Sequence, residues 1–274
     1  PRINVRRHPV GSGPLEVADD RAERWPAAGG FVVAGFSAGA SAVALERFVA
    51  VIKGVCQKTG HPMPPHLTPL AEGHAIPEPP PLEEALETAG LAFDDAQSAC
   101  LFANIVNLTI TDGRVRDRSL VELAAETLRL DRDSARDVTE ALEARFQQNA
   151  FRDDEEWALF CAVLLVMAAA DEEVAQSETA YLQRVVPDLK HIEAGKKFLE
   201  EKADTLDDEV ARLSSRQKRC LTAHAIGMML IDGDYKGTEQ ELLESLSGQM
   251  SLAQFDQDRL LKGLYALYNV SVLA

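Results

Sequence analysis

Two pairs of acidic residues recur with the same spacing in the second half of the chain. Asp171 is followed seven residues later by Glu178, and Asp232 is followed seven residues later by Glu239. Carboxylate oxygens are the ligands that Ca²⁺ and Mg²⁺ prefer, so each pair could contribute to a site for a hard divalent cation. The alternative is structural, because a glutamate at the beginning of a helix also complements the positive end of the helix dipole.

A second motif suggests nucleophilic catalysis. Residues 35–39 read Gly-Phe-Ser-Ala-Gly, which matches the G-x-S-x-G nucleophile elbow with Ser37 as the nucleophile. An elbow serine needs a parallel sheet that includes earlier strands, but no convincing strand precedes Phe31 and the chain after residue 81 has a helical pattern. We therefore predict no catalytic residue and no enzymatic activity. Gly35 and Gly39 fit better as small residues on one face of a helix.

Other ligand patterns fail at particular positions. Residues 232–243 match a calcium-binding loop at positions 1, 3 and 6, but Lys236 occupies position 5 and Leu243 replaces the bidentate glutamate at position 12, which excludes an EF-hand. The histidines have no ligand spacing, and the cysteines form no C-x-x-C pair. We expect reduced, packed thiols and no cofactor other than a divalent cation.

The most informative signal is an internal repeat. Three segments each run from a cysteine through a mostly apolar stretch to an aspartate. The cysteines are Cys100, Cys161 and Cys220, and the aspartates are Asp112, Asp171 and Asp232. The aspartates lie 59 and 61 residues apart. Because the cysteines hold equivalent places, we predict a shared small buried position rather than three reactive thiols.

Each repeat is predicted to form a helix, an acidic bend and a second helix. Gly113 and Gly233 follow the aspartates of the first and third bends, where each could adopt the left-handed conformation of a helix C-cap. The motifs Ser-x-x-Glu at 119–122 and Thr-x-x-Glu at 238–241 predict capping boxes for the helices that follow.

Residues 157–270 resemble the tellurite-resistance TerB-like family, in which an apolar helix runs into Asp-Gly, a short turn and a glutamate that opens the next helix. The matching segments are VLLVMAAADEEVAQSE and GMMLIDGDYKGTE, and residues 98–146 are similar to a degenerate unit of the same kind. The resemblance implies a compact α-helical bundle without catalytic activity, metal-binding acidic residues near the turns, and membrane-associated partners.

Carried over residue by residue, the resemblance implies a metal site at the second and third bends. Its ligands would be Asp171, Glu178, Asp232, Asp234 and Glu239. Glu173 departs from the family pattern, because it stands where the glycine is expected. In the first repeat Ser119 follows Asp112 at the glutamate position, so that carboxylate pair is absent.

The predicted fold class is all-α: a helical bundle of repeated helix-turn-helix units, preceded by an extended N-terminal arm with one apolar helix. We predict an irregular segment at 1–25, the apolar helix within 26–58 and a proline-rich linker at 59–84. A first, degenerate helical unit follows at 85–150 and the TerB-like domain at 151–274.

The apolar segment admits two interpretations. Residues 26–45 carry no charge and are just long enough to span a bilayer, but their glycines and serines make them weakly hydrophobic. A buried or docking helix is the simpler prediction, and membrane association through residues 26–55 is the alternative. The chain begins without methionine, from which we expect a processed product or a fragment.

The net charge of −16 limits the class of partner. Such a charge repels phosphate backbones, so we expect no nucleic-acid binding, and it suits cations or basic protein surfaces instead.

One function consistent with these features is a cation-binding, non-enzymatic helical protein that acts through protein partners. The other is an accessory or linker subunit of a larger, membrane-associated assembly, docked by residues 1–85 and without a functional metal site. In either case we expect a reducing compartment, the cytoplasm or an organelle interior, or a membrane surface facing it.

Overall fold

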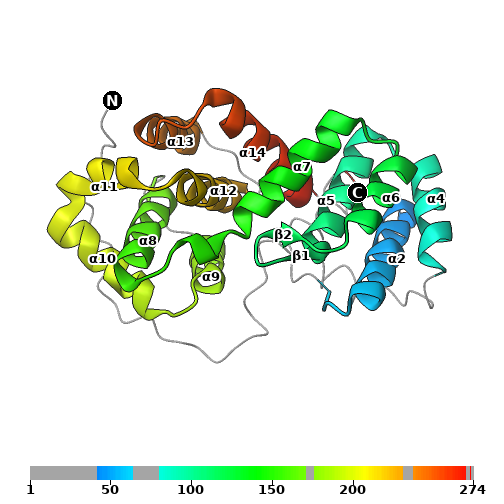
Figure 1. Ribbon diagram of the computed structural model, residues 1–274, viewed down its shortest axis with the longest axis horizontal. Coiled ribbons are helices and arrows are strands. Elements are labelled where there is room, and N and C mark those ends of the chain that lie inside the picture. Colours follow the sequence, from blue (N-terminus) through cyan, green and yellow to red (C-terminus); the bar gives the residue numbers. More distant parts are fainter. Residues whose placement is uncertain (1–41, 64–79, 171–175, 231–236, 270–271, 273–274) are drawn as a thin grey trace. The chain divides into compact units, whose positions relative to one another are not determined.

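The computed structural model describes residues 42–63, 80–170, 176–230, 237–269 and 272 (Figure 1). Most of these residues are helical and only four belong to strands, so the predicted all-α class is confirmed. Ser37, the irregular segment at 1–25 and most of the proline-rich linker lie outside the described residues.

The described residues belong to two compact units. We call residues 148–257 the central unit, and we call the described residues before 148 together with those from 258 onward the N-terminal unit. This division differs from the predicted one, which placed residues 151–274 in a single domain. The difference arises because the last helix packs on helices that precede the central unit in the sequence.

The N-terminal unit is built from six helices and one hairpin among its described residues. They are α2 (Ala42–Thr59), α4 (Leu82–Ala92), α5 (Asp95–Thr109), β1 (Ile110–Thr111), β2 (Arg114–Val115), α6 (Arg118–Thr127), α7 (Arg132–Arg145) and most of α14 (Gln254–Tyr268).

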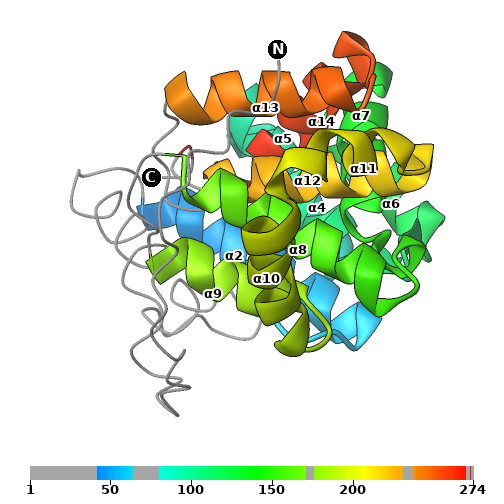
Figure 2. The same ribbon diagram turned by 90° about the vertical axis from the view of Figure 1, so that its left-hand side faces the viewer.

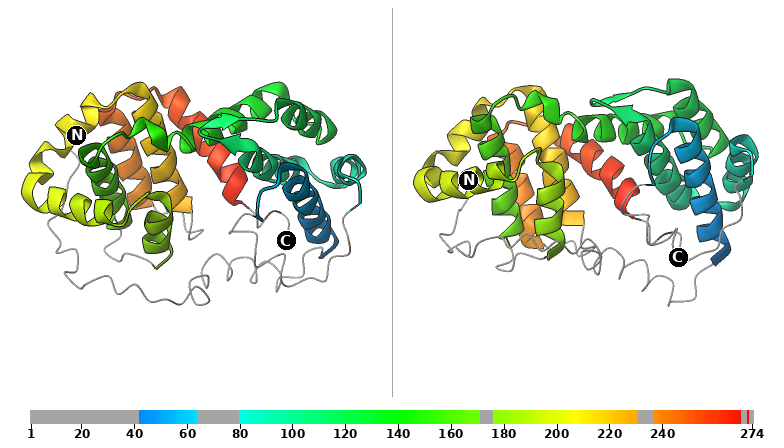
Figure 3. Two further views of the ribbon diagram at one scale, coloured as in Figure 1. Left: turned by 60° about the horizontal axis from the view of Figure 1, so that its bottom comes forward. Right: turned by 90° about the horizontal axis from the view of Figure 1, so that it is seen from below.

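Helix α2 supplies part of the core of the N-terminal unit. Phe48, Ile52 and Val55 recur at helical spacing, and all three are buried where α2 packs on α4 and α5. Figure 3 shows α2 in blue beside these helices. The part of the predicted apolar helix that the structure describes is therefore used for packing within the chain. Among the described residues, no helix is both long and apolar enough to cross a membrane.

A short hairpin forms the first bend in place of the predicted helix cap. Helix α5 ends at Thr109, and β1 then pairs with β2 in antiparallel register. Asp112 and Gly113 have φ values of 52° and 73°, which is the left-handed conformation that a two-residue hairpin turn needs at both positions. The left-handed conformation predicted for Gly113 is confirmed, but its assignment to a helix C-cap was wrong.

The helix after this bend begins earlier than its capping-box motif predicts. The N-cap of α6 is Asp117, whose carboxylate accepts a hydrogen bond of 2.9 Å from the backbone N–H of Leu120, so Ser119 lies within the first turn. Asp and Ser are both good N-caps. The hairpin ends just before Asp117 and places it at the start of the helix, so Asp117 rather than Ser119 is the N-cap. Helix α13 likewise begins at Gly237, which places Thr238 inside the helix rather than at its cap.

Helix α14 packs closely on α7. Gly263 permits this approach, because a Cβ added there would lie 2.5 Å from Cβ of Ala141 and 3.1 Å from the backbone oxygen of Asp137. On α14, Leu260, Leu264 and Leu267 are fully buried. The close approach at Gly263 and the row of buried leucines together make α14 part of the N-terminal core.

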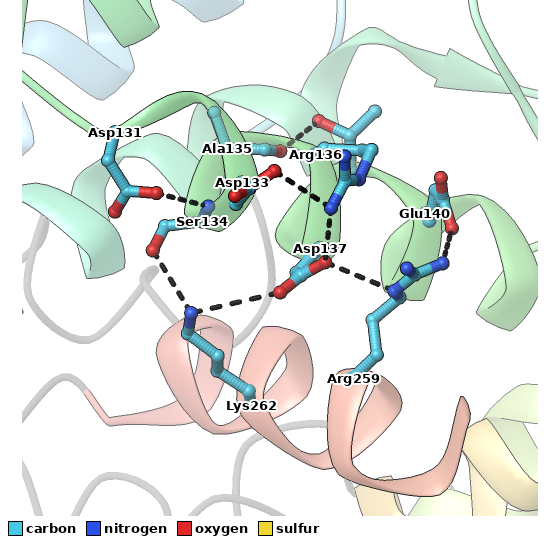
Figure 4. A network of polar contacts seen from close by, with 10 residues as sticks. Asp131, Asp133, Ser134, Ala135, Arg136, Asp137, Glu140, Arg259 and Lys262 are labelled. Atoms are coloured by element: carbon cyan, nitrogen blue, oxygen red, sulfur yellow. Dashed lines mark hydrogen bonds and ion pairs between the residues drawn. The ribbon is translucent and has the colours of Figure 1, made fainter. Parts of the chain in front are cut away.

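Charged side chains reinforce the contact between α7 and α14 (Figure 4). Nε of Arg259 lies 3.0 Å from Oδ1 of Asp137, and the same guanidinium hydrogen-bonds to Glu140. The Nε–H group does not point at the Asp137 oxygen, so that contact is an ion pair rather than a linear hydrogen bond. On the neighbouring turn, Lys262 donates a hydrogen bond of 3.0 Å to the hydroxyl of Ser134.

The central unit is helical throughout its described residues. Its elements are η2 (Gln148–Ala150), α8 (Asp154–Ala168), α9 (Gln176–Val185), α10 (Lys190–Lys202), η3 (Ala203–Thr205), α11 (Leu206–Arg212), α12 (Ser215–Leu230) and α13 (Gly237–Gln249). Helix α8 is apolar on nearly every side, which is typical of a helix buried at the centre of a unit. Helices α10, α12, α9 and α13 surround it.

The packing of α10 along α8 depends on a glycine (Figure 2). A Cβ at Gly195 would lie 2.7 Å from Cβ of Cys161 and 2.9 Å from the backbone nitrogen of Ala162. Cys161 is fully buried, and so are Cys100 in α5 and Cys220 in α12. The prediction that the three cysteines share a buried position is confirmed.

The three predicted repeats correspond to three successions of helices. Each begins with a long buried helix and continues into two further helices: α5–α6–α7, α8–α9–α10 and α12–α13–α14. The long helices α5, α8 and α12 each carry one of the three buried cysteines. The order of helices inferred from the sequence is therefore present in all three repeats, while residues 171–175 and 231–236 of the second and third bends lie outside the described residues.

Candidate functional site

The candidate site consists of the acidic bends and the helices that flank them. Asp171, Asp232 and Asp234 lie outside the described residues, and so does the side chain of Glu239 in the first turn of α13. Glu178, in the first turn of α9, is described. The second bend joins α8 to α9 and the third joins α12 to α13, as the repeat predicts.

Glu178 is unusual among the acidic residues because it is buried. Its relative exposure is 4%, and no other carboxylate among the described residues is buried to this degree. Acidic residues in the first turns of other helices, such as Glu83 and Asp133, are exposed. An ionised carboxylate is expensive to bury unless charges or hydrogen-bond donors compensate it. Interaction with the helix dipole is available to an exposed carboxylate as well, and the other first-turn carboxylates named here use it from the surface.

A hydrogen bond between two buried side chains joins α9 to α12. Tyr181 lies one helical turn after Glu178, on the same side of α9. Its hydroxyl oxygen is 2.9 Å from Nδ1 of His224, and both side chains are about 1% exposed. This bond ties the helix that follows the second bend to the helix that precedes the third.

Other contacts hold the ring of His224 in place. Its Nε2 lies 3.3 Å from Nε2 of Gln148, and the ring of Phe160 in α8 packs edge-on against it with centroids 5.4 Å apart. With the Gln148 amide nitrogen as donor, Nε2 of His224 accepts, and Nδ1 donates its proton to the oxygen of Tyr181. Both ring nitrogens are engaged within the protein, so His224 is a structural residue rather than a metal ligand.

The thiols do not extend the candidate ligand set. Burial raises the pKa of Cys100 and of Cys161 to about 12, so both stay protonated at neutral pH. A thiol must lose its proton to bind a metal ion, and burial opposes that loss. The free cysteines agree with the expectation of packed rather than reactive thiols.

The acidic run before Trp157 opens helix α8. Asp153 is the N-cap and accepts a hydrogen bond of 2.9 Å from the backbone N–H of Glu156. Asp154 binds across to α10, where its carboxylate lies 3.0 Å from Nε2 of His191 and 3.1 Å from Nζ of Lys190. These hydrogen bonds, led by the one from His191, lower the pKa of Asp154.

The first bend differs in its chemistry from the other two. The carboxylate of Asp112 pairs with Arg116 at 3.2 Å on the surface, and the backbone N–H of Val115 donates to Glu143 in α7. This bend is therefore closed by its own hairpin and side chains. Within the residues that the structure describes, no group of three or more histidines, cysteines or carboxylates is arranged to hold a metal ion.

Sequence reasoning did not identify Tyr181 and His224 as partners. The available signal is a polar residue inside an apolar helix, since His224 stands among buried alanines and methionines of α12. Buried polar groups almost always have a hydrogen-bond partner, which implies one for His224. The sequence does not say which residue that partner is.

No family model matches this chain, and neither the curated proteins nor the solved structures contain a significant match to it.

Proposed function

We propose that this chain is a non-enzymatic, TerB-like α-helical protein that binds a divalent cation, Ca²⁺ or Mg²⁺, through carboxylates at its second and third bends and acts through protein partners. The ligands would be Asp171 and Glu178 at one bend and Asp232, Asp234 and Glu239 at the other. Carboxylate oxygens without nitrogen or sulfur donors favour hard cations over zinc or copper.

The observation that carries this proposal is the burial of Glu178. A carboxylate that ligates a cation is commonly enclosed by the fold, whereas first-turn carboxylates of other helices in this chain, such as Glu83 and Asp133, are exposed. The described part of the site therefore favours the ligand interpretation for Glu178 over the capping interpretation. The exposed ion pair of Asp112 with Arg116 agrees with a cation role confined to the other two bends.

The proposal is tested by isothermal titration of CaCl₂ and, separately, of MgCl₂ into the full-length chain. The whole chain is needed because α14 packs on α7, so a fragment that begins near residue 150 would lack the surface that α14 contacts. Glu178→Gln and Asp232→Asn should each weaken cation binding about tenfold or more, the scale of loss expected when a metal site loses an interaction.

The matched control is Glu241→Gln, which makes the same chemical change at an exposed position of α13. It should leave the cation affinity unchanged. Absence of binding heat with both cations in the unmodified chain would refute the cation proposal and leave helix capping as the role of the bend carboxylates.

A second candidate function is that of an accessory subunit in a larger assembly. The observation in its favour is a set of large apolar side chains on the surface, of which Leu91 is 75% exposed and Phe255 is 62% exposed. A partner that docks through residues 1–85 would have to use positions other than the buried face of α2. Co-purification of a partner with the unmodified chain, lost on Leu91→Ser or Phe255→Ser, would support this function.

A further inference from the structure

His191, in the first turn of α10, is a buried histidine with only one ring nitrogen paired. Its side chain is 6% exposed, and Nε2 lies 3.0 Å from Oδ1 of Asp154 in α8. Because a carboxylate only accepts hydrogen bonds, Nε2 carries the proton and donates to Asp154, which leaves a lone pair on Nδ1. Among the described residues, this buried Nδ1 has no hydrogen-bond partner. The neutral ring therefore suits its surroundings, since it leaves no N–H group unpaired.

Protonation of His191 changes this balance. The added proton goes to Nδ1, where it forms a buried N–H donor without an acceptor, and the positive charge of the ring is largely removed from water. Two neighbours favour the charged ring. They are the carboxylate of Asp154 and the indole of Trp157, which stacks on the imidazole with ring centroids 5.7 Å apart.

The charged groups around the ring offset only part of this cost. Asp154 is 73% exposed, so solvent screens its charge, and its Oδ1 also lies 3.1 Å from Nζ of Lys190. Lys190 in turn repels a second positive charge. Asp188, which precedes α10, accepts a hydrogen bond from the backbone N–H of Lys190 rather than from the ring. The unpaired Nδ1–H group therefore outweighs the ion pair with Asp154.

The two parts of α10 are attached to α8 in different ways. The N-cap of α10, Leu189, makes no side-chain hydrogen bond, and the first turn is joined to α8 by the polar contacts of Lys190 and His191 with Asp154. One turn further along, Gly195 packs closely on the α8 backbone. The polar contacts of the first turn thus depend on the charge of His191, whereas the packing around Gly195 does not.

We propose that His191 is an acid-sensitive switch, whose protonation releases the first turn of α10 from α8 and exposes Trp157 to solvent. Histidine is the side chain that ordinarily changes charge between pH 5 and pH 8, so the switch acts in this interval. Asp154 changes charge at lower pH, because its hydrogen bonds lower its pKa. This switch does not depend on the proposed cation function.

The test follows the fluorescence of Trp157 and the urea midpoint from pH 8 to pH 5. The chain has two tryptophans, so Trp25→Phe leaves Trp157 as the emitter. In this background we expect the emission maximum to move to longer wavelength, and the midpoint to fall, as the pH decreases. His191→Gln keeps an amide donor for Asp154 but does not titrate, and it should remove most of both changes. His61→Gln, the same substitution at an exposed position, should leave them intact.

An emission maximum that stays constant as the pH falls, or a response that persists in His191→Gln, would refute the proposal. A midpoint that rises on acidification only when His191 is present would also refute it, because the ion pair with Asp154 would then outweigh the unpaired Nδ1–H group.

If His191→Gln does not fold, amide hydrogen exchange in the unmodified chain decides. After correction for the intrinsic pH dependence of exchange, the amides of residues 190–194 should lose about tenfold in protection between pH 8 and pH 5, relative to those of α12. Protection that changes equally in both segments would refute the switch.

Discussion

Gly263 of α14 lies directly against Ala141 of α7, at a distance that leaves no room for a side chain. We predict that Gly263→Ala destabilises the chain by about 1–2 kcal/mol, because overpacking against Ala141 and the α7 backbone outweighs the gain in helix propensity. Urea unfolding measures the effect. Gly248→Ala on α13 is the matched control: its Cβ would meet nothing within 4 Å, so we expect stabilisation of about 0.5–1 kcal/mol. Equal free energies of unfolding for the two variants would contradict the close approach of α14.

The partly buried ion pair between Arg259 of α14 and Asp137 of α7 should contribute more to stability than ion pairs on the surface. Asp137 and Arg259 have side-chain exposures of 16% and 13%, and truncating one partner leaves the other charge poorly compensated. We expect Arg259→Ala to lower the free energy of unfolding by about 1–2 kcal/mol. Arg212→Ala removes a solvent-exposed pair with Glu209 and should change it by less than about 0.5 kcal/mol. Similar losses in the free energy of unfolding for Arg259→Ala and Arg212→Ala would show that the network in Figure 4 stabilises the chain no more than an exposed ion pair does.

Helix α2 should be essential for the stability of the N-terminal unit. Ile52 is fully buried where α2 packs on α4 and α5, so Ile52→Ala should cost about 2–4 kcal/mol through lost burial and a residual cavity. For the same reason, deletion of residues 1–85 should destabilise this unit, although the arm interpretation of the sequence implies that the bundle would stay folded. Unchanged cooperative melting of that truncation would show that α2 is dispensable.

The contact between α8 and α10 should make the stability of the chain fall at acidic pH. The hydrogen bond from His191, followed by that from Lys190, lowers the pKa of Asp154. A carboxyl group whose pKa is lower in the folded chain stabilises the fold above its unfolded pKa of about 3.9, and this contribution is lost as the pH falls through the folded value. Asp154→Asn should therefore reduce stability at pH 7 and narrow the difference in urea midpoint between pH 7 and pH 3.

The exposed neighbour Glu155 supplies the control for this pH dependence. Glu155→Gln makes the same type of change on the first turn of α8. The difference in urea midpoint between pH 7 and pH 3 should be the same for this variant as for the unmodified chain. If Asp154→Asn also kept the full difference in urea midpoint between pH 7 and pH 3, the hydrogen bond to His191 would not contribute to the acid sensitivity of the fold.

Much of the fold follows from patterns that are local in sequence. The cysteines at 100, 161 and 220 mark three long buried helices because small apolar side chains are needed where helices approach closely, as Cys161 does opposite Gly195. The aspartates that follow these helices recur after 59 and 61 residues, so the order of helices could be predicted without tertiary information.

Features that depend on distant contacts could not be predicted in this way. Nothing near Gly263 in the sequence reveals that α14 packs on Ala141, so the sequence does not place residues 258–268 in the N-terminal unit. At the first bend, Asp112-Gly113 suits both a helix end and a hairpin, and the pairing of Ile110 with Val115 decides between them. Of the candidate site, the position of Glu178 at the start of α9 could be read from the repeat, but its burial and the Tyr181–His224 bond could not.

The most direct test of the cation proposal is the stability of Glu178→Gln with and without cation. Thermal unfolding is recorded for this variant and the unmodified chain in EDTA and in saturating CaCl₂ or MgCl₂. If Glu178 ligates a cation, the cation raises the midpoint of the unmodified chain, and Glu178→Gln abolishes most of that rise. If Glu178→Gln lowers the midpoint equally in EDTA and in cation, or the cation shifts neither midpoint, Glu178 has a purely structural role and the account is wrong.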